Sequence, residues 1–329
     1  MPDVPKRPVK RRRRDRLGRR IRQVFERVAA RVAAALIPCL SRRAVVRLSH
    51  AAAAVACRVA GRDRRIAEAN LRVVFGDALS AVEERRILRA AFQSFALMML
   101  DTFWLGRDTR RRIASVFVMD ERMREVLAIR PQICITGHFG NWDLFGVALA
   151  AAGMPLSSVA MTQQNVAIDR MLNARRALTG MQVIPRDGAL RKLLRELRAD
   201  RCVALLMDQN TRPEEGGVFL PFCGLPAPVS QVVDVLQRRT GATLCMGFCL
   251  PDADGHYHVH GIKAIRPEPT GDDPLAITRL VLTELEAAVR RYPEYWLWAY
   301  RRWRFVPDGC SLDDYPYYAR RYKPKKERA

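Results

Sequence analysis

The clearest indication of the fold is the stretch Ile133-Cys134-Ile135-Thr136-Gly137-His138-Phe139-Gly140-Asn141-Trp142-Asp143. Its first four residues form a short apolar run that is typical of a buried strand, and the glycine after them ends that strand. A helical pattern begins near Asn141, so His138 lies in the turn that joins the strand to the helix. In an open α/β sheet this turn lies at the carboxyl edge, where ligands bind.

The segments around this stretch repeat the alternation of strand and helix. Apolar runs predict strands at 133–136, 157–161, 181–184, 203–207 and 243–250, and helical patterns occupy 141–152, 167–178, 189–199 and 229–239. This order predicts an α/β fold with a largely parallel sheet flanked by helices. The residues before about 105 are mostly helical in pattern and predict a helical N-terminal layer. An exposed strand at 256–265 and a helix at 274–291 follow.

The chain is strongly basic. Its 329 residues include 57 Lys and Arg against 34 Asp and Glu, which gives a net charge of +23, and ten of the first twenty residues are basic. Such a charge predicts a polyanionic partner, and nucleic acid, anionic lipid and an acidic carrier protein all qualify. The eight cysteines are scattered without a Cys-x-x-Cys pair. We expect them to be reduced, as in a cytosolic compartment.

Three regions are expected along the chain. They are a basic N-terminal arm with the start of an amphipathic helix at 1–27, a main domain at 28–312 and a basic C-terminal tail at 313–329. The segment 28–40 is too short to span a bilayer, and a signal peptide is not expected. Apolar residues recur at helical spacing at Ile21, Val24, Phe25, Val28, Val32 and Leu36. The pattern predicts a helix that lies in a membrane interface or packs on the protein's own core.

His138 and Asp143 are a candidate base and its orienting carboxylate. If both residues were helical they would lie on different faces, so His138 must precede the helix for the pair to meet. The carboxylate can then fix the imidazole tautomer, which activates a hydroxyl. Gly140 would let the backbone approach a ligand closely, and turn amides near it could donate to an oxyanion. The alternative is a core histidine beside a helix-capping aspartate.

Residues 136–143 resemble the first sequence block of the bacterial lipid A late acyltransferases, a family of the lysophospholipid acyltransferase superfamily. Further blocks match in chain order at 65–71 with Phe75, and at 207–209, 218–224, 238–242 and 295–303. The resemblance spans roughly residues 30–306 and implies that 28–312 is an acyltransferase domain. It departs at Asp143, where these enzymes often carry Glu, and at Ser230-Gln231, where a small-residue pattern is usual.

The resemblance also implies an arginine about one strand–helix unit after the histidine and an aspartate at the end of the next strand. These positions fall at Arg176 (or Arg175) and at Asp208, so the expected catalytic residues are His138, Asp143, Arg176 and Asp208. Substrate-binding roles are expected for Phe139, Gly140, Asn141, Arg175, Gln209, Phe222 and Gly224. The alternatives are an exposed helix face for the arginines and a loop residue that caps amides for Asp208.

The implied reaction transfers a fatty acyl group from an acyl-carrier-protein thioester to a hydroxyl of a lipid A precursor or related glycolipid, without cofactor or metal. The expected location is the cytoplasmic face of the bacterial inner membrane, on anionic lipid. A coenzyme A donor with a lysophospholipid or another glycolipid as acceptor stays open. The sequence has no phosphate loop and no nucleophile elbow, which disfavours nucleotide hydrolysis and serine esterase chemistry. A basic nucleic-acid-binding protein is the alternative of another class, although no nucleic-acid module accompanies the charge and no nucleic-acid partner is expected.

Overall fold

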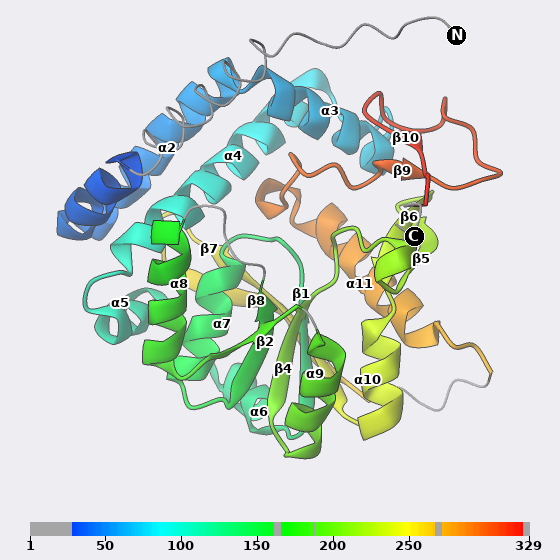
Figure 1. Cartoon of the computed structure of the whole chain (residues 1–329). Coiled ribbons are helices and arrows are strands. Elements are labelled where there is room, and N and C mark those ends of the chain that lie inside the picture. The colour runs from blue at the N-terminus through cyan, green and yellow to red at the C-terminus, as the bar shows by residue number, and fades with distance from the viewer. Residues whose placement is uncertain (1–27, 161–165, 187, 267–271, 325–329) are drawn as a thin grey trace, which may run out of the picture.

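The computed structural model describes residues 28–160, 166–186, 188–266 and 272–324, and it confirms the α/β fold (Figure 1). Six strands form one sheet in the order β3-β2-β4-β1-β7-β8. Their bounds are β1 (Gln132–Thr136), β2 (Leu156–Ala160), β3 (Gln182–Pro185), β4 (Cys202–Leu206), β7 (Thr243–Pro251) and β8 (Tyr257–Ile265). All neighbours pair in parallel except β8, which is antiparallel to β7. The sheet is therefore largely parallel, as predicted.

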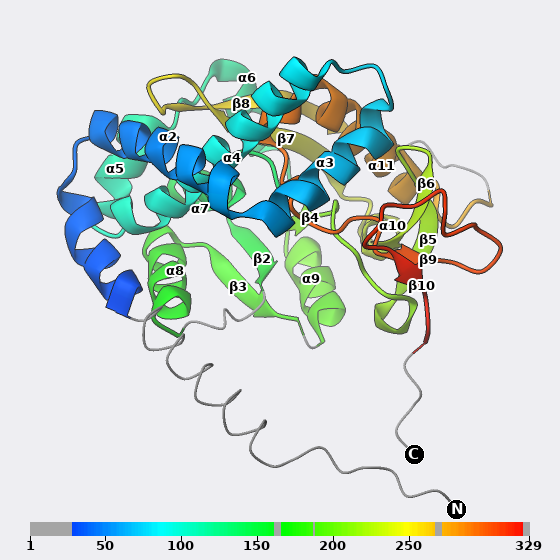
Figure 2. The ribbon, with the colours of Figure 1, turned by 90° about the horizontal axis from the view of Figure 1, so that it is seen from above.

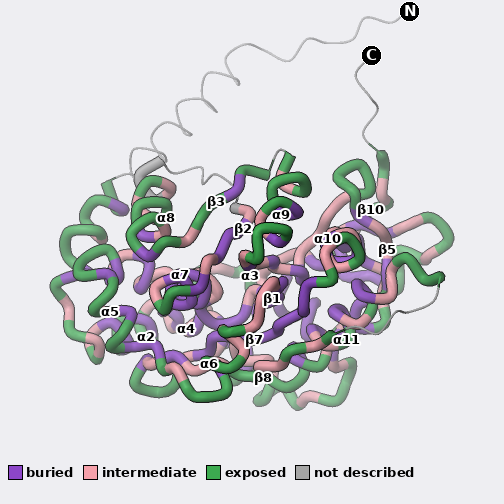
Figure 3. The backbone as a smooth tube through the Cα atoms, turned by 90° about the horizontal axis from the view of Figure 1, so that it is seen from below, coloured by how far each residue is buried: buried purple, intermediate pink, exposed green. Residues whose placement is uncertain are grey.

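Helices cover both faces of this sheet (Figure 2). One face carries α5 (Thr109–Val116), α6 (Glu121–Ala128), α7 (Trp142–Ala151) and α8 (Val166–Thr179), and the other carries α9 (Ala189–Arg198), α10 (Val232–Thr240) and α11 (Ala276–Arg291). Each side has its own cluster of buried apolar side chains. The central strands are buried accordingly (Figure 3). Burial on both faces explains why β1 reads as a continuous apolar run instead of an alternating one.

The helical N-terminal layer is also confirmed. Residues 28–36 are helical, and η1 (Ile37–Cys39), α2 (Arg42–Val59), α3 (Gly61–Phe75) and α4 (Ala81–Trp104) follow them. A capping box between Ser80 and Glu83 starts α4. These helices lie across the carboxyl ends of the parallel strands (Figure 1). In the ranges described above, no single helix is long and apolar enough to cross a membrane, and only the bent pair α2 and α3 passes that test together.

The C-terminal part of the chain packs beside this layer. After η3 (Pro293–Tyr295), the strand β9 (Phe305–Val306) pairs in parallel with β10 (Arg320–Arg321). Tyr315 is buried, and its hydroxyl donates to the carbonyl oxygen of Pro226 at 3.0 Å. The segment predicted as a tail is thus attached to the domain as far as β10, whereas 325–329 and the arm 1–27 lie outside the described residues.

The hairpin near the active site was not predicted from the sequence, nor were the short helices α5 and α6 and the strands β9 and β10. Strands β5 (Gly217–Phe222) and β6 (Leu225–Ser230) pair in antiparallel fashion, and the turn between them places Cys223 and Gly224 at positive φ. The helix predicted from Val229 therefore begins at Val232, where the Ser230 hydroxyl accepts the backbone N–H at 3.3 Å. The prolines at 226 and 228 have no backbone N–H to donate, which is consistent with the extended backbone before Val232.

Candidate active site

The turn after β1 brings His138 against Asp208, which follows the neighbouring strand β4. Nδ1 of His138 lies 2.8 Å from Oδ1 of Asp208, and the His138 backbone N–H donates to Oδ2 at 2.8 Å. Trp296 donates its indole N–H to the same Oδ2 at 2.9 Å. A side chain at Gly137 would put its Cβ 3.1 Å from the Asp208 carboxylate, so glycine permits this close approach.

The carboxylate of Asp208 is buried and ionised. Burial alone would raise the pKa of Asp208, but the imidazole of His138 and the three hydrogen bonds hold that pKa below its ordinary value. An ionised carboxylate only accepts hydrogen bonds, so the ring hydrogen of neutral His138 is on Nδ1 and the lone pair is on Nε2. The side chain of His138 keeps 16% of its surface exposed. The arrangement is that of an oriented general base.

Asp143 does not orient His138, which corrects the interpretation of the sequence. Its Oδ1 accepts from Nη2 of Arg176 at 2.8 Å, and its Oδ2 accepts from Nη2 of Arg175. The physical reason is that Asp143 belongs to the first turn of α7 and faces α8, which carries both arginines. Arg175 is buried, and burial together with the charge of Arg176 lowers its pKa to about 10. The pair of arginines therefore needs the carboxylate of Asp143 to be stable in the interior.

The turn amides at Gly140 are not free to bind an oxyanion, which is a second correction. The N–H of Gly140 donates to the Tyr295 carbonyl at 3.0 Å, and that of Asn141 donates to the Cys249 carbonyl at 3.0 Å. Gly140 has φ +51°, and a Cβ there would lie 2.1 Å from the Cys249 carbonyl oxygen. Glycine is required because protein backbone, and not a ligand, approaches at this position.

The other residues predicted to bind substrate lie in supporting positions. Phe139 is buried against Phe248, with ring centroids 4.7 Å apart, and Phe222 is buried 6.1 Å from the ring of Trp296. Asn141 caps α7 by accepting the N–H of Leu144 at 2.9 Å. Of the two remaining positions, Gln209 directly follows Asp208, and Gly224 lies in the turn of the hairpin. The hairpin thus supports the aromatic residues behind Asp208.

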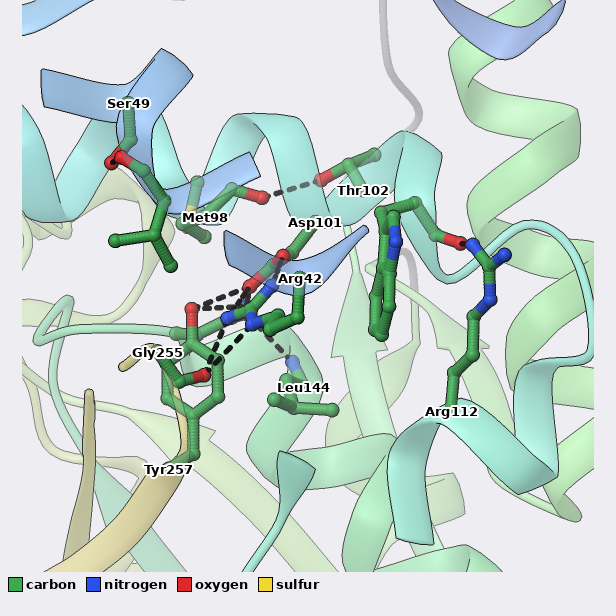
Figure 4. Close-up of polar contacts among 12 residues, drawn as sticks. Arg42, Ser49, Met98, Asp101, Thr102, Arg112, Leu144, Gly255 and Tyr257 are labelled. Atoms are coloured by element: carbon green, nitrogen blue, oxygen red, sulfur yellow. Dashed lines mark hydrogen bonds and ion pairs between the residues drawn. The ribbon is translucent and has the colours of Figure 1, made fainter. Parts of the chain in front are cut away.

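A buried polar network, which was not predicted from the sequence, ties the N-terminal layer to the start of α7 (Figure 4). Asp101 of α4 is buried and accepts the hydroxyl of Tyr257 at 2.6 Å. Arg42 of α2 pairs with the same carboxylate, and Nδ2 of Asn141 lies 3.5 Å from it. Because Asn141 caps α7, this network fixes the turn that carries His138. The contacts join residues 40 to 156 positions apart, which no local pattern reports.

An apolar cavity lies between α7 and the sheet. Its volume is about 60 Å³, and Trp142, Phe145 and Gly146 of α7 line one wall. Methionines contribute four further side chains to its lining: Met123, Met154, Met181 and Met246. The ring of Trp142 lies 4.7 Å from the ring of His138, measured between centroids. Part of the cavity lining is thus formed by a residue that contacts the ring of His138.

Comparison with known proteins identifies the family to which this geometry belongs. The model of the bacterial lipid A biosynthesis acyltransferase family matches residues 19–305. The chain belongs to this family. It is therefore an acyltransferase, and the resemblance found in the sequence is confirmed.

Three curated relatives of this acyltransferase cover most of its length. A phosphatidylinositol mannoside acyltransferase of Mycolicibacterium smegmatis is 26% identical over 66% of this chain and 72% of its own. The lipid A biosynthesis palmitoleoyltransferase of Escherichia coli is 24% identical over 76% of this chain and 81% of its own. The lipid A biosynthesis lauroyltransferase of Escherichia coli is 24% identical over 80% and 87%. The relatives thus differ in the acyl chain or the acceptor that their names carry.

Proposed function

We propose that this acyltransferase moves a fatty acyl chain from an acyl-carrier-protein thioester to a hydroxyl of a lipid A precursor or related glycolipid. The observation that carries the proposal is the pair of His138 and Asp208 at the carboxyl edge of the sheet. Within the described residues no hydrogen bond involves Nε2 of His138, and the side chain is partly exposed. The acceptor class rests on the relatives, which are named for lipid A or for a mannosylated lipid.

The reaction needs one base that later acts as an acid. Nε2 of His138 removes the proton of the acceptor hydroxyl while the oxygen attacks the carbonyl carbon of the thioester. The tetrahedral intermediate then collapses, the carbon–sulfur bond breaks, and the imidazolium returns the proton to the departing thiolate. Asp208 stabilises the imidazolium because its carboxylate is ionised and already accepts from Nδ1.

The oxyanion is expected to bind at the first turn of α7. The amides of Gly140 and Asn141 are engaged, but the N–H groups of Trp142 and Asp143 have no acceptor in the described part of the chain. First-turn amides and the positive end of the helix dipole favour a developing negative charge. Arg175 and Arg176 contribute indirectly, since their ion pairs with Asp143 hold the same turn in place.

The apolar cavity beneath α7 is the proposed site for the acyl chain. Trp142 is among its lining residues, which are mainly apolar side chains of α7 and the sheet. Its volume of about 60 Å³ is small, so a fatty acyl chain requires its lining to move. Methionine side chains suit this because they are unbranched and adapt their shape to what they contact.

The direct test is a transfer assay with purified protein, carrier-linked and coenzyme A donors of several chain lengths, and a panel of acceptors that includes a lipid A precursor, a mannosylated lipid and a lysophospholipid. Mass spectrometry of the products should show ester formation on a glycolipid with the carrier-linked donor. Loss of transfer in folded His138→Ala protein is expected, because general-base assistance contributes about 10²- to 10⁴-fold. Transfer only to lysophospholipid, or full activity of this variant, would contradict the proposal.

We also propose that the enzyme works on anionic lipid at the cytoplasmic face of the inner membrane. The apolar face of helix 28–36 supports this, because Val28, Val32 and Leu36 are 52%, 51% and 62% exposed. On α2, Val55 and Val59 are exposed as well. Apolar residues in this arrangement beside basic ones favour interfacial binding. The free state of all eight cysteines suits a reducing compartment.

Flotation with vesicles tests this attachment. The protein should float with vesicles that contain anionic lipid, and high salt or alkaline carbonate should release it at least in part. Val32→Glu with Leu36→Glu should weaken flotation, whereas Leu312→Glu, an exposed apolar position outside the N-terminal layer, should not. Resistance to both release treatments, or equal flotation of the variants, would contradict interfacial attachment.

A further inference from the structure

Arginines gather around one aromatic ring beside the N-terminal layer. The guanidinium carbons of Arg212, Arg304 and Arg320 lie 5.4, 5.3 and 5.6 Å from the centroid of the Phe305 ring. They come from three separate segments, the loop after Asp208, the approach to β9, and β10. The fold therefore assembles this group from distant parts of the chain, and Phe305 holds its members by cation–π contact.

These arginines lack carboxylate partners. In the ranges that the structure describes, none of Arg212, Arg301, Arg304 and Arg320 lies within ion-pair distance of an Asp or Glu. Burial lowers the pKa of Arg304, and the charges of the other three lower it further. Cations that repel one another at such short range are stabilised by a bound anion.

The group lines a hollow and not a flat surface. A concavity of about 460 Å³ is bordered by Arg62, Arg212, Arg301 and Arg304, together with Asp63 and Glu215. Glu215 is already paired with Arg186 at 2.7 Å. A second concavity of about 640 Å³, which shares Arg212 and Phe305 with the first, adds Arg320, Arg321 and Lys323. A recess bordered by guanidinium groups suits a compact, multiply charged anion.

The hollow adjoins an apolar groove that borders the turn carrying His138. This groove of about 300 Å³ shares Asp63, Ala299 and Tyr300 with the hollow, and it is lined by Phe92, Phe95 and other apolar side chains of α4. Leu297, which also lines the groove, donates its backbone N–H to the His138 carbonyl at 3.0 Å. An amphipathic molecule can therefore lie with its anionic group in the hollow and its apolar part beside the turn that carries His138.

We propose that Arg212, Arg301 and Arg304 bind a phosphoryl group of the acceptor lipid, an inference that rests on the acyl-transfer function proposed above. A phosphoryl group matches the planar fork of arginine with parallel hydrogen bonds and carries up to two charges. An acidic carrier protein is the weaker candidate occupant, since it would need a broad outward surface and would not explain the apolar groove. Arg62 in the first concavity and Arg320 in the second add to the positive potential.

The test compares one glycolipid acceptor with and without its phosphate, the latter prepared by phosphatase treatment. Wild-type protein should show a lower KM for the phosphorylated acceptor. Arg301→Gln with Arg304→Gln should raise that KM at least 10-fold and leave kcat within about 3-fold, while the KM for the dephosphorylated acceptor should hardly change. Arg304→Lys, which keeps the charge but loses the fork, should give an intermediate KM.

The matched control removes the same charge elsewhere. Arg195→Gln with Arg198→Gln, both exposed at the end of α9, should leave both KM values unchanged. Equal losses of the Arg301 and Arg304 double variant on the two acceptors, or a KM change for the carrier-linked donor alone, would overturn the proposal. The last result would assign the site to the carrier protein.

A binding measurement separates this inference from the catalytic one. His138→Ala protein in detergent micelles should bind the phosphorylated acceptor more tightly than the dephosphorylated one, and the arginine variants should abolish that difference. Failure of the protein to transfer acyl groups would refute the proposed function without affecting this result. Equal binding of the two acceptors by His138→Ala protein would refute the phosphoryl site alone.

Discussion

Replacing Asp208 by asparagine tests the geometry of the active site most sharply. Two donors, the His138 backbone N–H and the Trp296 indole N–H, point at Oδ2, so the asparagine oxygen is expected to take that place. The amide nitrogen then occupies the position of Oδ1, 2.8 Å from Nδ1 of His138, and donates to it. This reverses the tautomer, because the ring hydrogen must move to Nε2, and the base is lost.

The magnitude follows from the same reasoning. The corresponding change in a serine protease triad lowers kcat about 10⁴-fold, and a buried pair that keeps its geometry should lose about 10²- to 10⁴-fold here, or about 3 to 5 kcal/mol of transition-state stabilisation. KM for donor and acceptor should change little. The assay is steady-state transfer with carrier-linked donor, with circular dichroism to confirm folding. A folded Asp208→Asn protein with more than a tenth of wild-type kcat would refute the assignment.

Three further variants address the supporting structure. Asp143→Asn should act mainly on stability, with a loss of about 3 to 5 kcal/mol in the free energy of unfolding measured by urea titration, because two partly buried arginines lose their carboxylate; a stable but inactive variant would instead restore a catalytic role for this residue. Gly140→Ala should fail to fold or lose several kcal/mol, since its Cβ would collide with the Cys249 carbonyl, and a wild-type melting temperature would show that the turn is wrongly placed. Asp101→Ala should cost about 3 to 5 kcal/mol, as it leaves Arg42 unpaired in the interior; normal stability with normal activity would mean that the network does not fix α7.

The fold was predictable because its signals are local. Buried parallel strands such as β1 read as short apolar runs, and the helices between them carry their own periodicity and caps. The hairpin of β5 and β6 was not predictable in this way. Its residues matched a family block, and two prolines in β6 broke the alternation by which a strand is recognised.

The sequence predicted where the residues of the candidate site lie, but not how they pair. His138, Asp143, Arg175, Arg176 and Asp208 all lie at or near the carboxyl edge, as their positions after strands or in the adjoining helices suggested. The direction in which the first turn of α7 faces determines whether Asp143 or Asp208 contacts the imidazole of His138. That direction is set by contacts between residues far apart in sequence, such as the bond between Asn141 and Asp101.

The nitrogen-15 NMR spectrum of the His138 ring reports whether Asp208 holds the ring hydrogen on Nδ1. With labelled histidine, the resonances of His138 can be assigned by their absence from His138→Gln protein. In the neutral imidazole we expect Nδ1 to carry the hydrogen and Nε2 to show the chemical shift of an unprotonated nitrogen. Asp208→Asn should reverse the two nitrogens, and Asp143→Asn should leave them unchanged. A wild-type ring with its hydrogen on Nε2, or a reversal caused by Asp143→Asn instead, would contradict the assignment of His138 and Asp208 as the catalytic pair.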